Sequence, residues 1–109
     1  MMNNLFLSNM KDDFIVILEE KSSSPIDKDR LSIDYETDLD ELMEKYLGLL
    51  REQARLLSQA KNKGNELAVL SALLKLRTHA MSLSSFFDAI VEDTEIIIRL
   101  DSWSELPEK

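Results

Sequence analysis

The sequence predicts a mainly α-helical protein built on an antiparallel hairpin of two long helices, at about residues 38–61 and 66–91. Three observations lead to this prediction. Apolar residues recur every three or four positions through both segments, a tight turn separates the segments, and the 109-residue chain has only two glycines and two prolines. This pattern is typical of amphipathic helices in a single domain. The flanking segments, an arm and linker at 1–37 and a strand with an acidic tail at 92–109, differ in composition.

The first helix is expected to present an apolar face wider than one partner helix can cover. Thr37 and Asp38 can cap its start, with Asp40 and Glu41 following as in a capping box. Gly64 can adopt the left-handed conformation that ends it. A row of apolar residues in heptads and a second row beside it form the face. The rows are Leu39, Leu42, Tyr46, Leu49, Leu56 and Ala60, and Met43, Leu47, Leu50, Ala54 and Leu57.

The second helix is expected to begin after Asn65, a residue that favours the N-cap position. Its main apolar row alternates steps of four and three, and a weaker second row is interrupted by Arg77 and Ser84. A third face of alanines and serines either lets another helix approach closely or is merely solvated. The main row is Val69, Leu73, Leu76, Ala80, Leu83, Phe87 and Ile90, and the small face is Ala68, Ala72, Ser82 and Ser85.

Two helices joined by about three residues must be antiparallel neighbours, and alone they cannot bury two wide apolar faces. The hairpin at 38–91 is therefore predicted to be an oligomerisation core that assembles copies of the chain into a helical bundle. Gly48, in the middle of the first helix, would permit a close helix crossing. The residues expected in the hairpin and oligomer interfaces are Leu49, Leu56, Leu73, Leu76, Leu83 and Phe87.

The segments outside the hairpin are less regular. Residues 1–13 are expected to form a loosely held arm, and residues 14–18 (Phe-Ile-Val-Ile-Leu) favour a strand because Val and Ile suit a pleated surface. A short helix capped by Asn9 is the alternative. Residues 19–37 are typical of a long polar linker. After a polar break, residues 95–100 are predicted to be a second strand.

The net charge of −8 is unevenly distributed. Residues 45–79 hold seven basic residues against Glu52 and Glu66, a net charge of +5, which leaves −13 for the remainder. The overall charge argues against a free-standing nucleic-acid-binding protein, but the local charge allows phosphate contacts near the turn, without sequence readout. The alternative is a solvated face that partly pairs with Glu52 and the acidic tail. The residues expected to contact DNA phosphates are Arg51, Arg55, Lys61, Lys63 and Lys75.

We predict no catalytic residue, no cofactor and no metal ion. The chain has no cysteine and one histidine, His79, which lies within a helix and not in the setting of a nucleophile. The carboxylates between Asp38 and Glu44 are explained by capping of a helix start. No run approaches the roughly 18 apolar residues of a membrane span, and no secretory signal is recognisable, so a cytoplasmic protein is expected.

The run from Leu57 to Arg77 resembles the hairpin of small terminase subunits from tailed bacteriophages. In that family a long helix, a tight turn with glycine or asparagine and a second long helix form the oligomerisation core. Residues Leu73 to Arg77 are similar to a Leu-x-x-Leu-Arg-like segment of the second helix. The resemblance implies that residues 95–100 join a crown of strands and that the acidic tail engages the large terminase subunit. Residues 1–37 are too short for the helix-turn-helix domain of many members.

The leading hypothesis is therefore a non-enzymatic DNA-packaging component in the host cytoplasm. It would form a ring through its hairpins, hold double-stranded DNA with its basic zone and regulate a motor ATPase through its ends. Ile97, Leu100 and Trp103 are the residues expected to dock the protein partner. The alternative is a small helical adaptor or inhibitor that binds one protein through an exposed helix face. An enzyme, the third reading, would depend on His79 or on the carboxylates between residues 38 and 44.

Overall fold

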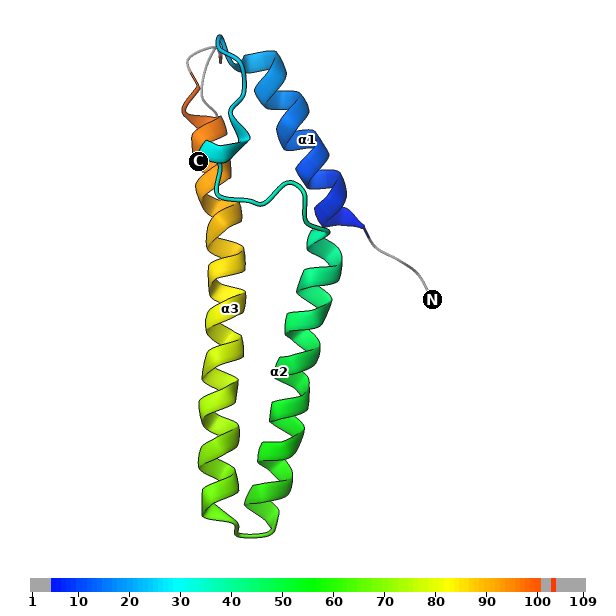
Figure 1. Cartoon of the computed structure of the whole chain (residues 1–109), viewed down its shortest axis with the longest axis vertical. Helices are drawn as coiled ribbons and strands as arrows, with labels where there is room; N and C mark the ends of the chain where they lie inside the picture. The colour runs from blue at the N-terminus through cyan, green and yellow to red at the C-terminus, as the bar shows by residue number, and fades with distance from the viewer. Residues whose placement is uncertain (1–4, 101–102, 104–109) are drawn as a thin grey trace. The chain divides into compact units, whose positions relative to one another are not determined.

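The computed structural model describes residues 5–100 and 103. Helix α1 spans Phe6–Lys21, a 3-10 helix η1 spans Lys28–Arg30, and the long helices α2 and α3 span Leu39–Asn62 and Glu66–Ile98 (Figure 1). The predicted mainly helical fold with a long hairpin is confirmed, and the described residues contain no strand. None of these helices combines the length and apolar character that crossing a membrane requires.

The chain divides into two compact units. The hairpin unit comprises residues 41–87, and the terminal unit comprises residues 1–40 together with 88–109. Helices α2 and α3 contribute to both units, and each unit has its own buried residues.

The turn of the hairpin forms as predicted. Gly64 has φ +68°, and its N–H donates to the carbonyl of Lys61 at 3.1 Å while the N–H of Asn65 donates to the carbonyl of Ala60 at 3.0 Å. These two bonds form a Schellman motif, which satisfies the free carbonyls at the end of α2. The Asn65 side chain then accepts a hydrogen bond from the N–H of Ala68 at 3.0 Å and caps α3.

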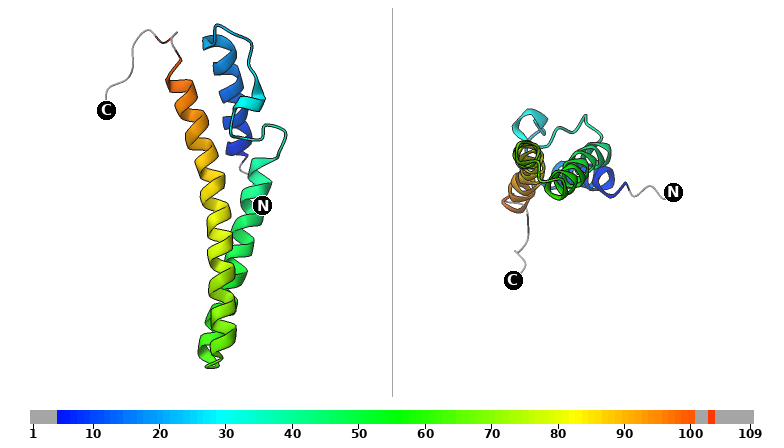
Figure 2. Two further views of the ribbon diagram at one scale, coloured as in Figure 1. Left: turned by 60° about the vertical axis from the view of Figure 1, so that its left-hand side comes forward. Right: turned by 90° about the horizontal axis from the view of Figure 1, so that it is seen from below.

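Within the hairpin unit, α2 and α3 lie side by side (Figures 1 and 2). Near the turn the buried residues are Ala60 and Ala72, and Ala72 is only 2% exposed. Further along, Phe86 is buried and its ring meets the ring of Tyr46 edge-on, with centroids 6.2 Å apart. The small face of α3 therefore contributes to the hairpin contact, and Phe86 is buried while the predicted row residue Phe87 is exposed.

Helix α1 corrects the prediction for the N-terminal segment. Residues 14–18, expected to be a strand, lie inside this helix, and the expected loose arm is helical from Phe6 onward. Leu7, Phe14 and Leu18 recur at helical spacing, and Leu7 and Leu18 are buried. Burial of this face outweighs the β-propensity of the intervening Ile and Val residues.

A residue from a distant part of the sequence caps the start of α1. Leu5, which precedes the helix, makes no side-chain capping bond, and the expected cap, Asn9, lies within the helix. The Asp40 carboxylate instead accepts hydrogen bonds from the backbone N–H groups of Leu7 at 3.0 Å and Ser8 at 2.8 Å, and from the Ser8 hydroxyl at 2.8 Å. Burial opposes ionisation of Asp40, but these hydrogen bonds outweigh it and hold the pKa of Asp40 below its usual value.

Helix α3 continues beyond its predicted end at residue 91. The polar residues 92–94, predicted to be a break, are helical, and the predicted strand 95–100 is helical as far as Ile98. The prediction of a break was wrong because the Asp93 side chain is turned inward and is 0% exposed. Ile97, four residues later and thus on the same helix face, is also buried.

The Asp93 carboxylate fastens the segment before α2 to α3. It accepts hydrogen bonds from the N–H groups of Ser32 at 2.6 Å and Ile33 at 2.9 Å, and from the Tyr35 hydroxyl at 2.9 Å. Burial raises the pKa of Tyr35 well above its usual value, and the hydrogen bond to Asp93 and its negative charge raise it further. Part of the predicted linker at 19–37 is therefore tied to the terminal unit, with Ile33 buried.

Candidate functional site

The hairpin unit has two open grooves near the turn, on opposite sides of the α2–α3 pair. We call the first the cationic groove. It has a volume of about 250 Å³, and Gln53, Gln59, Lys63, Asn65, Ser71 and Lys75 are the polar residues that line it. The second, the apolar groove, has a volume of about 380 Å³ and is lined by Lys61, Gly64, Glu66, Val69, Leu70 and Leu73. The α3 residues of the two grooves fall on opposite sides of that helix, because each residue advances about 100° around its axis.

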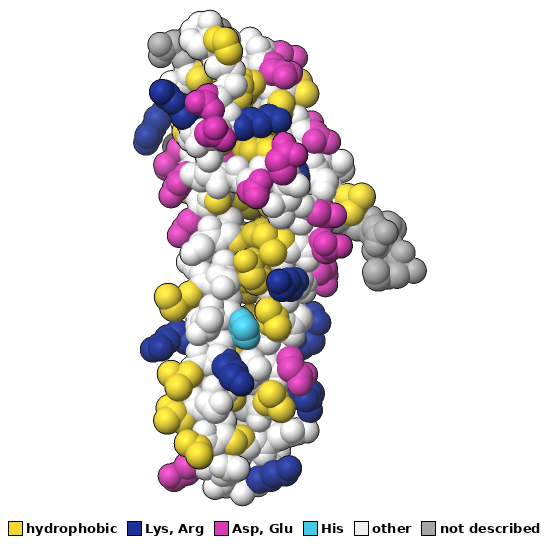
Figure 3. All heavy atoms as spheres, in the orientation of Figure 1, with side chains coloured by type: hydrophobic (Ala, Val, Ile, Leu, Met, Phe, Trp, Pro, Cys, Tyr) yellow, Lys and Arg dark blue, Asp and Glu magenta, His cyan; other side chains and the backbone are white. Residues whose placement is uncertain are grey.

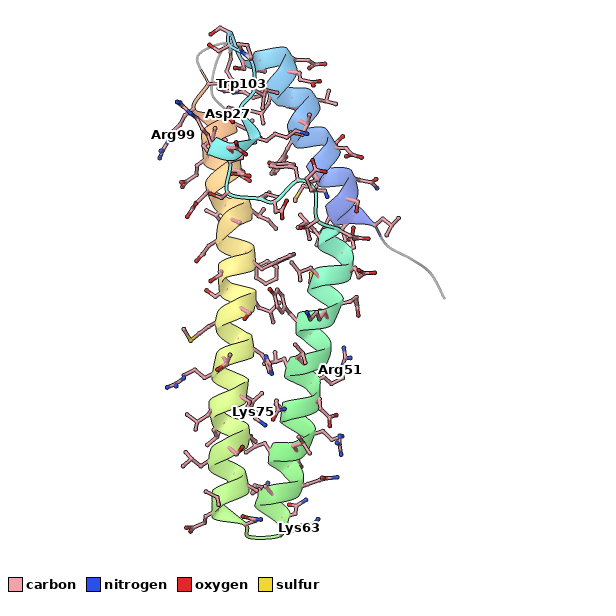
Figure 4. All side chains as sticks on the ribbon, viewed as in Figure 1. Asp27, Arg51, Lys63, Lys75, Arg99 and Trp103 are labelled. Atoms are coloured by element: carbon pink, nitrogen blue, oxygen red, sulfur yellow. The ribbon has the colours of Figure 1, made fainter. Side chains whose placement is uncertain are left out.

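The cationic groove offers hydrogen-bond donors and positive charge. No carboxylate lines it, and within the described residues neither Lys63 nor Lys75 has an ion-pair partner. Figure 4 shows Lys75 reaching over the space between the two helices and Lys63 at the turn. Two ammonium groups with neighbouring amide and hydroxyl groups can bind a phosphate anion by charge and by hydrogen bonds.

The other predicted phosphate-contacting residues lie elsewhere on the hairpin. Arg51 points away from α3 on the outer side of α2 (Figure 4). Arg55, also exposed, donates from its Nε to Glu52 at 3.0 Å, and this hydrogen bond lowers the pKa of Glu52. Lys61 lines the apolar groove. Of the five residues named from the sequence, the structure brings only Lys63 and Lys75 together in one groove.

An apolar stripe runs along the outer side of α3, and its yellow side chains are visible toward the turn in Figure 3. It comprises Leu67, Leu70, Leu73, Leu74 and Met81, all of them exposed. Leu67 is 78%, Met81 62% and Leu70 53% exposed. The four leucines adjoin one another and Met81 lies beyond Arg77; apolar side chains that cluster in this way on one helix are typical of an interaction site, unlike single apolar residues scattered over a protein.

The residues predicted for the hairpin and oligomer interfaces divide into two groups. Leu83 is buried within the hairpin unit, and Leu56 and Leu76 are half-buried. Leu49, Leu73 and Phe87 are exposed. The second group is therefore available for a contact outside the chain.

Comparisons with protein-family models, with curated proteins and with solved structures give no match for this chain.

In the terminal unit, the residues predicted to dock a partner make contacts within their own chain. Ile97 is buried, and its carbonyl accepts a hydrogen bond from the Trp103 indole N–H at 2.8 Å. The Lys21 ammonium lies 4.9 Å from the centre of the Trp103 ring. Leu100 is half-buried, and the rest of the acidic tail lies outside the described residues. Partner docking at this end stays a prediction.

The described residues contain no group of three or more histidines and acidic residues that could hold a metal ion. Asp40, one of the clustered carboxylates near the start of α2, serves as the cap of α1. His79 is half-buried within α3.

The sequence did not indicate the polar residues that line the cationic groove beside Lys63 and Lys75. Gln59 and Ser71 carry no periodic signal, since each is one polar residue among many on a helix. Gln53, by contrast, occupies a distinct position, because it is the one polar residue in the heptad row of α2. In the structure this position lies in the cationic groove.

Proposed function

We propose that this chain is a non-enzymatic assembly component that self-associates through α3 and holds the phosphate backbone of double-stranded DNA. This is the role that the resemblance to phage small terminase subunits implies. The observation that carries the proposal is the two-sided hairpin, with an apolar stripe on the outer side of α3 and a cationic groove on the opposite side.

Self-association is supported by the amount of apolar surface on α3. Burying a whole leucine side chain contributes about 1.5–3 kcal/mol. Leu67, Leu70, Leu73 and Leu74 are each about half or more exposed, so their burial in a contact contributes several kcal/mol in all. A helical bundle of several copies would bury this surface.

The DNA contact is supported by charge and not by shape. The hairpin unit has no element that reads base edges, and its exposed basic residues would contact phosphates only. Such binding is weakened strongly by salt and depends little on sequence. A negatively charged chain can hold DNA in this way when assembly places several cationic grooves along one duplex.

The DNA contact can be tested by fluorescence anisotropy with a short labelled duplex at about 50 and 200 mM salt. We expect Lys63→Glu and Lys75→Glu each to weaken binding and, where one phosphate contact is lost, to reduce the salt slope by about one. Lys45→Glu makes the same charge change at an exposed position of α2 outside the groove and serves as the control. Equal losses from all three variants, or no binding by the native chain at low salt, would refute the DNA role.

A second candidate function rests on the same apolar stripe. An exposed helix face of this kind also fits an adaptor that offers its helix to an apolar groove of one protein partner. Native mass spectrometry separates the two functions. A stable homo-oligomer of the isolated chain supports the assembly role, whereas an isolated monomer that forms a 1:1 complex supports the adaptor.

A further inference from the structure

We propose that Leu70 and Leu73, the part of the apolar stripe that borders the apolar groove, are covered by the same residues of a second copy, in an antiparallel two-fold contact centred between Ser71 and Ala72. This inference rests on the self-association proposed above and names its partner and its register. The contact is formed by four residues on one side of α3, which are Glu66, Leu70, Leu73 and Arg77.

These four residues lie in line along the helix. They are separated by steps of four, three and four, the spacing of side chains on one face of an α-helix. All four are exposed, and Glu66, Leu70 and Leu73 also line the apolar groove. The leucines of a second copy would meet this groove and complete a cluster of four leucine side chains about the two-fold axis.

The charges at the two ends of the line select the antiparallel arrangement. Glu66 is the only acidic residue between positions 66 and 87, and within the described residues neither it nor Arg77 has an ion-pair partner. At a rise of about 1.5 Å per residue, each lies about 8 Å from the proposed centre, in opposite directions. A two-fold axis there places Glu66 of each copy opposite Arg77 of the other, forming two equivalent ion pairs.

Other arrangements of the same stripe are less favourable. A parallel pairing in register would oppose Glu66 to Glu66 and Arg77 to Arg77, which is repulsive. An antiparallel shift of one helical turn in one direction would set Arg77 against Leu70. The opposite shift would set Glu66 against Leu73 or Leu74, and a charged group against an apolar side chain loses hydration without gaining a partner.

The proposed contact leaves the cationic groove of each copy open. Lys75 projects from the side of α3 opposite to the line of Glu66, Leu70, Leu73 and Arg77, so two joined hairpins would present one cationic groove on each outer surface. Because the two-fold contact is isologous, it closes on itself and produces a dimer. Contacts between dimers would then be needed to place several cationic grooves along one duplex.

Sedimentation equilibrium of the full chain tests the register by charge reversal. Glu66→Arg and Arg77→Glu each convert both ion pairs into like-charge contacts, so we expect either variant alone to associate at least about tenfold more weakly than the native chain. Mixing the two variants in equal amounts creates two attractive pairs in the mixed dimer. The mixture and the double variant should both regain native affinity to within about twofold.

Glu44→Arg and Lys45→Glu are the matched controls, since they make the same charge changes at exposed positions of α2. Circular dichroism verifies that every variant stays helical.

A native chain that is monomeric at about 100 μM would overturn both this inference and the proposed self-association. A native oligomer that resists both reversals, or that is weakened but not restored by mixing, would overturn the register alone and leave self-association standing. Leu70→Asp should abolish association in any arrangement that uses the stripe, and intact association of that variant would overturn the inference.

Discussion

Replacing Asp93 by alanine should be among the most damaging single changes to the terminal unit. The Asp93 side chain is fully buried and accepts three hydrogen bonds, two of them from the backbone N–H groups of Ser32 and Ile33. Removing the carboxylate leaves both amides and the Tyr35 hydroxyl without this acceptor. A buried donor that loses its partner costs about 1–3 kcal/mol.

The magnitude follows from this count. Ile33 N lies in a buried bond, whereas the bonds from Ser32 and Tyr35 are partly buried and their donors can recover some hydration. We therefore expect Asp93→Ala to lower the free energy of unfolding by about 4 kcal/mol, near the upper end for a point substitution. Tyr35→Phe removes one bond only and should cost about 1 kcal/mol.

Urea denaturation followed by circular dichroism measures both effects, with Glu95→Ala as the control, because Glu95 is exposed on α3 two residues from Asp93. The control should change stability by less than about 0.5 kcal/mol. A loss below about 1 kcal/mol for Asp93→Ala would refute the argument that this carboxylate fastens residues 32–35 to α3. So would full additivity of Asp93→Ala and Tyr35→Phe, because two groups that share a hydrogen bond must show a coupling energy.

The Asp93–Tyr35 pair also predicts a response to alkali. Because the pKa of Tyr35 is raised in the folded protein, the folded state holds the phenol proton more tightly than the unfolded state. The stability due to this difference is complete below about pH 10, the usual pKa of tyrosine, and is lost as pH rises through the folded-state value. Ultraviolet titration of the native chain and of Tyr35→Phe should show this late-ionising phenol only in the former.

Three further substitutions concern the start of α1 and the two glycines. Asp40→Ala should destabilise α1 by about 2 kcal/mol, the scale of a lost N-cap. Because the pKa of Asp40 is lowered in the folded protein, the stability that the Asp40 carboxylate contributes should be lost as pH falls below about 4. Acid titration followed by circular dichroism measures this loss. Gly48→Ala should raise the stability measured by thermal unfolding by about 1 kcal/mol, because alanine favours a helix over glycine and the added Cβ would meet nothing within 4 Å. Gly64→Ala should lower the stability, because the φ of +68° at this position is unfavourable for alanine. A destabilising Gly48→Ala would indicate that a close helix crossing occurs at Gly48 in an assembly.

The hairpin could be predicted from the sequence because its signals are local. Gly64 and Asn65 mark the turn, and the three-four spacing of apolar residues marks both helices. The flanking segments could not be predicted in the same way, because their helical state depends on distant contacts. Asp40 and Asp93 resembled surface helix-start and break residues in the sequence, yet each carboxylate is buried and binds backbone N–H groups about 30 or 60 positions away.

The same reasoning explains why the sequence did not separate the two lysines of the cationic groove from the other basic residues near the turn. Five basic residues near the turn shared a charge, but charge does not specify on which side of a hairpin a residue lies. That depends on which face of α3 packs against α2, and Ala68 and Ala72 indicated this face only weakly, since small residues are equally common on solvated faces. Ala60 and Ala72 let the helices approach near the turn, which turns Lys75 into the cationic groove and leaves Leu70 and Leu73 on the outer side.

The choice of this small face has a consequence for function. Had α2 packed centrally on the row through Leu73, Ala80 and Phe87, the hairpin would have covered much of its own apolar surface, and Lys75 would have turned toward solvent away from the helix pair. The observed packing instead leaves Leu70 and Leu73 exposed, and it places the apolar and cationic residues on different sides of α3. A chain that folds alone gains nothing from exposed leucines, whereas a chain that assembles recovers their burial in the contact with its partner. In the proposed self-association, Leu70 and Leu73 would be one half of an interface, and Glu66 and Arg77 at its ends would supply the charges that align it.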